Sequence, residues 1–154
     1  MRGLLLLGHF LGMVLWLGAG AAAMQVGSVL RSGGAGREET ALLLGIMMRL
    51  YRGLLLPGAV LTVATGLLLS LRLYSGAISA AGYPTSMMVM QGAGLVAAVI
   101  AVGVMFPAAT RLTRLDPSGP HAEQFHRLRK RAGVSGMISG LLGLVALVAG
   151  AFLR

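Results

Sequence analysis

Four stretches of the sequence are each apolar over about 20 residues, the length that an α-helix needs to cross the hydrocarbon core of a bilayer. We predict spanning helices at residues 3–30, 41–71, 85–106 and 132–153, of which the second is clearest from Gly53 to Leu71. The sequence therefore predicts an all-α fold, an integral membrane four-helix bundle that forms one transmembrane domain over residues 1–154.

The composition supports this class. Of the 154 residues 56% are hydrophobic and only 11% are charged, too few to cover the surface of a soluble domain of this length. Cysteine is absent, which excludes disulfides, thiolate metal sites and cysteine nucleophiles in this chain. A secretory signal peptide is the alternative interpretation of the first stretch, but its apolar run is long for one and has no clear cleavage context.

Basic residues orient the predicted spans. One side of the membrane would hold Arg2, Arg72 and Arg154, and the other side would hold ten basic residues: Arg31, Arg37, Arg49, Arg52, Arg111, Arg114, Arg127, Arg129, Lys130 and Arg131. By the positive-inside rule the ten lie in the cytoplasm, so the N- and C-termini lie on the periplasmic side of a bacterial inner membrane. We interpret the net charge of +9 as a topology signal rather than a nucleic-acid interface, and expect the basic run at 127–131 to meet anionic lipid head groups.

Small residues are the expected source of helix packing, because lipid supplies no hydrophobic drive for helix association. In the fourth span glycines recur every three or four residues and predict one smooth packing face: Gly133, Gly136, Gly140 and Gly143. This face would pack the chain's own bundle, a homo-oligomer or a larger membrane complex. Pro57 and Pro107 are expected near helix ends, and Pro57 with Gly58 predicts a kink in the second span.

His9 is the ionisable residue that the pattern places within an apolar span, and such a residue is a functional candidate by default. Counting residues from the outer surface places Thr65 and Gln91 at a similar depth, so the three side chains could share hydrogen bonds. Alternatively, a neutral imidazole could bind haem b or copper, with Gln91 nearby or with a thioether as second ligand. The candidate thioethers are Met87, Met88 and Met90.

Sets of residues typical of enzymes are missing from the spans. All four carboxylates fall in predicted loops, and His121 and His126 stand in the third loop without a metal-spaced partner. This favours a protein without catalytic activity.

Two segments resemble a known group of membrane proteins. HFLGMVLWLG (His9 to Gly18) is similar to the opening helix of the copper-resistance protein D group and of HemJ-type protoporphyrinogen oxidases, and RLYRGLLLPGAVLTVATGLLL (Arg49 to Leu69) is similar to their second helix. The closest likeness is to uncharacterised four-helix members of this group. The resemblance implies that His9 corresponds to a haem ligand. Where those enzymes carry a functional lysine, this chain has Gln91, so protoporphyrinogen oxidation ranks last.

Three hypotheses follow from the sequence. The first is a small inner-membrane protein without catalytic activity that is part of a membrane complex. The second is a haem- or copper-binding redox or transport protein that uses His9, and the third is a HemJ-like oxidase.

Overall fold

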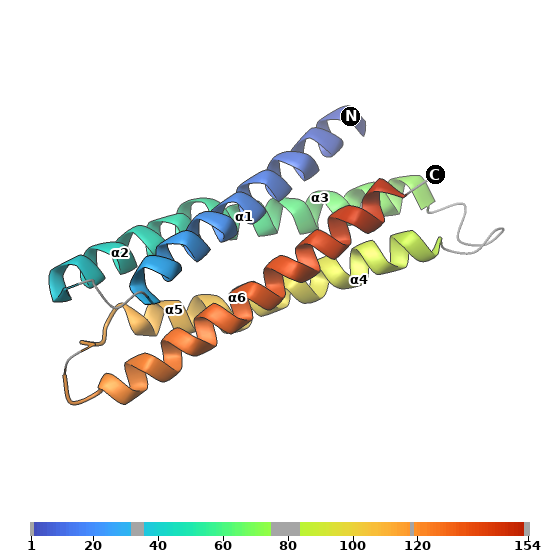
Figure 1. Ribbon diagram of the computed structural model, residues 1–154. Coiled ribbons are helices and arrows are strands. Elements are labelled where there is room, and N and C mark those ends of the chain that lie inside the picture. The colour runs from blue at the N-terminus through green and yellow to red at the C-terminus, as the bar shows by residue number, and fades with distance from the viewer. Residues whose placement is uncertain (1, 32–35, 75–83, 118, 153–154) are drawn as a thin grey trace.

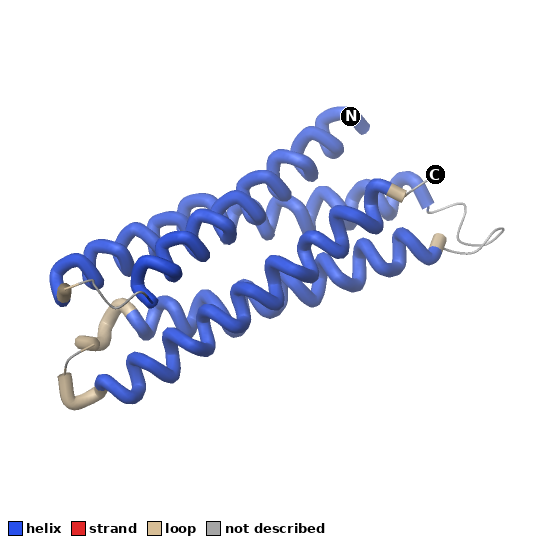
Figure 2. The backbone as a smooth tube through the Cα atoms, in the orientation of Figure 1, coloured by secondary structure: helices blue, strands red, loops and turns tan. Residues whose placement is uncertain are grey.

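The computed structural model describes residues 2–31, 36–74, 84–117 and 119–152. Its described part is helical and contains no strand, which confirms the all-α fold (Figures 1 and 2). The elements are α1 (Arg2–Arg31), α2 (Arg37–Leu50), the π-helix η1 (Tyr51–Leu55), α3 (Leu56–Tyr74), α4 (Thr85–Ile100), the π-helix η2 (Ala101–Met105), α5 (Phe106–Leu112) and α6 (Ala122–Ala151). Because α2, η1 and α3 are continuous, as are α4, η2 and α5, the described residues form four long helices.

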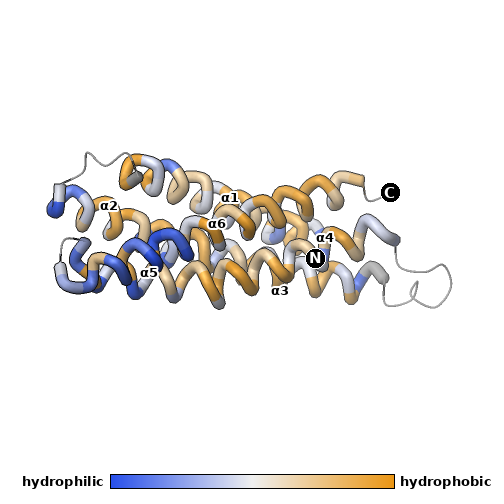
Figure 3. Tube along the Cα trace, turned by 60° about the horizontal axis from the view of Figure 1, so that its bottom comes forward, coloured by the Kyte–Doolittle hydropathy of each residue, from blue (hydrophilic) through white to orange (hydrophobic). Residues whose placement is uncertain are grey.

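All four long helices are apolar and long enough to cross a membrane, as a multi-pass membrane protein requires. The hydrophilic residues gather at one end of the bundle, around the start of α2, α5 and the start of α6 (Figure 3). The other end holds the N-terminus of α1, the C-terminus of α3, the N-terminus of α4 and the C-terminus of α6 (Figure 1).

The helices extend further at the basic end than hydropathy predicted. The second long helix begins at Arg37 rather than residue 41, the third ends at Leu112 rather than residue 106, and the fourth begins at Ala122 rather than residue 132. The expectation that the basic run at 127–131 lies in a loop is therefore wrong, since these residues belong to α6. Hydropathy detects where the apolar part of a helix ends and not where the helix itself ends. Arginine, lysine and leucine are good helix formers, so α6 continues beyond its apolar part.

Two helix pairs make up the bundle. In the first helix pair α1 packs along α3, and in the second helix pair α4 packs along α6. Contacts between the two pairs are fewer than contacts within either pair. The core is largest toward the basic end, where it includes these fully or almost fully buried side chains: Trp16, Tyr51, Leu55, Met105, Leu112 and Phe125.

Each proline inside a long helix follows a π-helical turn. In η1 the Leu56 N–H donates to the Tyr51 carbonyl, and in η2 the Phe106 N–H donates to the Ala101 carbonyl, each five residues back. Pro57 and Pro107 come next in the chain. Proline lacks the N–H for a helical bond and its ring clashes with the carbonyl four residues earlier, so a widened turn makes room for it. A π turn therefore precedes Pro57, where a kink was predicted. The expectation that Pro57 lies near a helix end is wrong, because the helix continues from Arg37 to Tyr74.

Candidate functional site

The first helix pair is held at a point where two backbones touch. A Cβ added to Gly12 of α1 would lie 2.7 Å from the Thr62 backbone nitrogen and 2.9 Å from the Gly58 carbonyl oxygen of α3. A Cβ added to Gly58 would lie 2.7 Å from the Trp16 nitrogen. Real Cβ atoms do not approach so closely, so α1 and α3 can only meet here because both residues are glycines.

His9 stands one turn from this contact and bridges the same two helices. Its Nδ1 lies 2.9 Å from the Thr62 carbonyl oxygen and 3.3 Å from the Thr65 hydroxyl oxygen. A carbonyl oxygen only accepts hydrogen bonds, so the geometry assigns the imidazole proton to Nδ1. Thr65 donates its own hydroxyl proton to the Leu61 carbonyl at 2.5 Å and can therefore accept from His9.

The imidazole ring of His9 packs directly against Gly66 of α3. A Cβ at Gly66 would lie 3.0 Å from His9 Cε1 and 3.3 Å from Nδ1, a spacing too tight for a side chain without a shift of the ring. His9 lies seven residues before the buried Trp16, and two helical turns place both on the core-facing side of α1. The position of the ring is therefore set from two directions, by a hydrogen bond and by packing.

Both hydrogen bonds that the described residues make with the imidazole use Nδ1. In a neutral imidazole with the proton on Nδ1, Nε2 keeps its lone pair. Histidines that bind metal ions in proteins have this arrangement, in which one nitrogen donates to a backbone carbonyl and the other faces the metal. The geometry thus leaves Nε2 available as a ligand atom.

The expected layer of three polar side chains is present in part. His9 and Thr65 are in contact, as counting residues by depth predicted. Gln91 of α4 instead donates to the Ser70 hydroxyl, and Ser70 donates to the Gly66 carbonyl at 2.8 Å. Gln91 therefore joins the two helix pairs about one turn further along α3 than Thr65.

The three candidate methionines do not converge on one point. Met87 is buried, Met88 is 57% exposed on the outside of α4, and the Met90 sulfur lies 3.1 Å from the place that a Cβ on Gly150 of α6 would occupy. Met88 lies on a different face of α4 from Met87 and Met90, so the three side chains are not directed at one point. Within the described residues no group of three His, Cys, Asp or Glu side chains could hold a metal ion.

The glycine face predicted on α6 is only half used for packing inside the chain. Gly143 is buried, and a Cβ there would meet Leu17 of α1 at 2.8 Å, while a Cβ on Gly136 would meet the Met105 sulfur at 3.1 Å. Gly133 and Gly140 would meet nothing within 4 Å, so the prediction of a single packing face within the chain is wrong for these two. The core face of α6 is instead marked by Ala132, Ser135, Ser139, Gly143 and Ala146.

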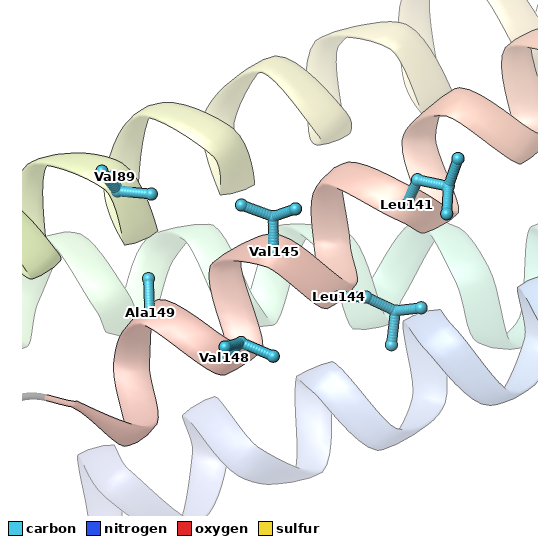
Figure 4. Close-up of a pocket in the computed structure, with 6 residues that line it drawn as sticks. All are labelled: Val89, Leu141, Leu144, Val145, Val148 and Ala149. Atoms are coloured by element: carbon cyan, nitrogen blue, oxygen red, sulfur yellow. The ribbon is translucent and has the colours of Figure 1, made fainter.

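A shallow apolar depression lies on the outside of the second helix pair, and Figure 4 shows the side chains that line it. It is lined by aliphatic side chains alone: Val89 of α4 and Leu141, Leu144, Val145, Val148 and Ala149 of α6. These residues offer no side-chain donor or acceptor to a polar ligand. In a bilayer the depression would face lipid chains.

The sequence did not lead us to place Gly58, Thr62, Gly66 and Ser70 in the site. The signals were present as the spacing of Gly8 and Gly12 on one helix and the closely spaced threonines, glycines and serine on the other. Small residues four apart allow close helix approach, and hydroxyl groups between helices provide hydrogen bonds.

Comparisons of this chain with known protein families, with curated proteins and with solved structures find no match.

Proposed function

We propose that this chain is a small bacterial inner-membrane protein without catalytic activity that acts as a structural member of a membrane complex. The observation that supports it is the use of polar side chains within the spans as clamps between helices. His9 joins α1 to α3, Gln91 joins α4 to α3, and the Ser139 hydroxyl joins α6 to α4 by donating to the Ala97 carbonyl at 2.9 Å. Among the described residues no buried side-chain nitrogen or oxygen lacks a hydrogen-bond partner. Groups used in this way stabilise a bundle rather than act on a substrate.

The proposed orientation has both termini in the periplasm and the basic end in the cytoplasm. It rests on the distribution of basic residues, three on one side and ten on the other. Alkaline phosphatase and fluorescent-protein fusions within the segment around Asp116 test it. The fluorescent fusion should be bright and the phosphatase fusion inactive, and the reverse pair of results would overturn the orientation.

A second function is favoured by one specific observation, the lone pair left on His9 Nε2. With Nδ1 fixed to the Thr62 carbonyl, the ring offers Nε2 as a ligand for haem iron or copper. A haem- or copper-binding redox or transport protein of the copper-resistance protein D and HemJ-like group is therefore the second proposal. Met87 and Gln91 stay as the candidates for a second ligand, since Met88 faces outward and Met90 packs on α6.

One experiment separates the two proposals. The His9→Asn variant places an amide N–H where Nδ1–H stands, so it can keep the bond to the Thr62 carbonyl while it removes the ligand nitrogen. Wild type and His9→Asn are purified in detergent from cells supplied with haem and copper, and their absorption spectra, metal contents and stabilities are measured.

The structural proposal expects no Soret band, no copper and nearly equal stabilities for the two proteins. A Soret band or stoichiometric copper in the wild type that His9→Asn abolishes would overturn it and would support the second proposal. His9→Ala serves as the control that loses both the hydrogen bond and the ligand.

A further inference from the structure

The basic run at 127–131 lies on a helix that continues out of the membrane. If the apolar part of α6 begins at Ala132, its 20 residues to Ala151 span about 30 Å, the thickness of the hydrocarbon core. The ten residues from Ala122 to Arg131 then extend about 15 Å beyond it. Arg131 and Arg127 stand about 2 Å and about 8 Å past this boundary, within the layer of lipid head groups.

The basic residues of the run at 127–131 lie on different faces of α6. Phe125 and Ala132 are buried on the core side of α6. Arg129 is partly buried on the same side, and its Nη1 donates to the Leu30 carbonyl at 3.2 Å, near the C-terminus of α1. A cation at this place satisfies a carbonyl that a helix end leaves free. Arg129 therefore has a structural role that the other basic residues of the run do not share.

Arg127 and Arg131 instead lie together on an exposed face of α6. With Gln124 and Leu128 they line a shallow hollow, at the spacings that place residues on one helix face. Arg127 also pairs with Glu123, from Nη2 to Oε1 at 2.7 Å, and its side chain is still 74% exposed. The hollow thus offers two guanidinium groups and one amide beside a single aliphatic side chain, with one carboxylate at its edge.

We propose that this hollow binds the phosphate of an anionic phospholipid head group. Guanidinium groups suit phosphate because they offer several N–H donors in a planar fork. Leu128 lies between the two arginines in sequence and gives the glycerol end of a lipid an apolar surface to lie against. The level of the hollow relative to the apolar part of α6 favours a lipid over a soluble phosphate, since a lipid phosphate is held at this depth. This site is independent of the His9 site and goes beyond the proposed function.

The test compares two double variants that remove the same charge. Arg127→Gln with Arg131→Gln alters the hollow, whereas Arg114→Gln with Lys130→Gln removes two exposed cations at the same end of the bundle that do not line it. The full chain in detergent is titrated with phosphatidylglycerol, with phosphatidylcholine and with inorganic phosphate, and bound lipid is counted by native mass spectrometry.

The wild type should bind phosphatidylglycerol at about tenfold lower concentration than phosphatidylcholine, in line with the attraction of individual basic residues to anionic lipid. The variant of the hollow should lose about tenfold in phosphatidylglycerol affinity, and the control variant should lose no more than about twofold. Equal losses in both variants would overturn the proposal in favour of diffuse charge attraction. Displacement of the lipid by inorganic phosphate at equal concentration would overturn it in favour of a soluble phosphate ligand.

Discussion

The two helix pairs achieve close packing in different ways. In the first helix pair the backbones of α1 and α3 touch at Gly12 and Gly58, and His9 adds a hydrogen bond to the Thr62 carbonyl. In the second helix pair the Ser139 hydroxyl bonds across to α4, and flexible methionine side chains fill the space beside glycines. The first pair therefore depends on rigid contacts, and the second depends on side chains that can adjust.

This difference determines how well each helix pair in a membrane can tolerate an amino-acid substitution. Without a hydrophobic drive, association depends on dispersion contacts and hydrogen bonds between helices, both of which require close approach. Where the close atoms belong to backbones, neither partner can move without separating the helices. Where one of them is the end of a leucine or methionine side chain, a rotamer change is enough.

The largest expected effect comes from adding one methyl group to each pair. Gly12→Ala places a Cβ 2.7 Å from the Thr62 nitrogen, and we expect a loss of about 3 kcal/mol in the free energy of unfolding, because the helices must move apart. Gly136→Ala of α6 meets only the flexible side chain of Met105, in the long helix that begins as α4, with its sulfur 3.1 Å from the added Cβ. We expect a change within about 1 kcal/mol, since alanine also favours the helix. Unfolding in mixed micelles, followed by the fluorescence of Trp16, measures both. Equal losses would mean that the two pairs do not differ in rigidity.

A smaller effect is expected from removing the polar clamp of each pair. His9→Ala should lower the free energy of unfolding by about 1 to 2 kcal/mol, because it removes a hydrogen bond and leaves space beside Gly66. Ser139→Ala should cost about 0.6 kcal/mol, the usual value for a hydrogen bond between membrane helices. The same micelle titration compares them. A larger loss for Ser139→Ala would reverse the order of the two clamps.

On the outside of the second helix pair we expect a gain in stability rather than a loss. Gly133→Ala and Gly140→Ala put a methyl group where no atom lies within 4 Å, so each should stabilise the isolated chain by up to about 1 kcal/mol through helix propensity. Thermal unfolding in detergent measures this gain. If either substitution lowers the apparent size of the protein in native membrane extracts, the glycine contacts a partner helix and not lipid.

Much of the fold could be predicted from the sequence because the bilayer sets the length of its elements. Hydropathy located all four spans, and counting depth brought His9 and Thr65 together. The rotation of each helix about its axis was harder to predict. Glycine occurs both at helix contacts and on lipid-facing surfaces, so Gly133 and Gly140 do not indicate which way they face. The hydroxyl residues Ser135 and Ser139, in contrast, lie on the core face of α6.

The end of the third and the start of the fourth span were also beyond the reach of hydropathy. Arg127 to Arg131 are hydrophilic and helical at once, and a scale built on transfer to lipid separates only the first property. The hydrogen bond from Arg129 to the Leu30 carbonyl joins residues far apart in the sequence and depends on how α6 and α1 are placed. Local patterns contain no information about that placement.

The two π turns change the angular position around the helix axis of the residues that follow them. In a regular α-helix each step of four residues overshoots a full turn by about 40°, so positions four apart drift around the axis. Across η1 and η2 the buried positions nevertheless recur every four residues, at Tyr51, Leu55 and Ala59 and at Ala101, Met105 and Ala109. A wider turn absorbs the overshoot. If η1 instead took regular α-helical geometry with all its residues kept, the eight steps from Tyr51 to Ala59 would overshoot two full turns by about 80°, and Gly58 would no longer face Gly12 even though no contacting residue had been altered.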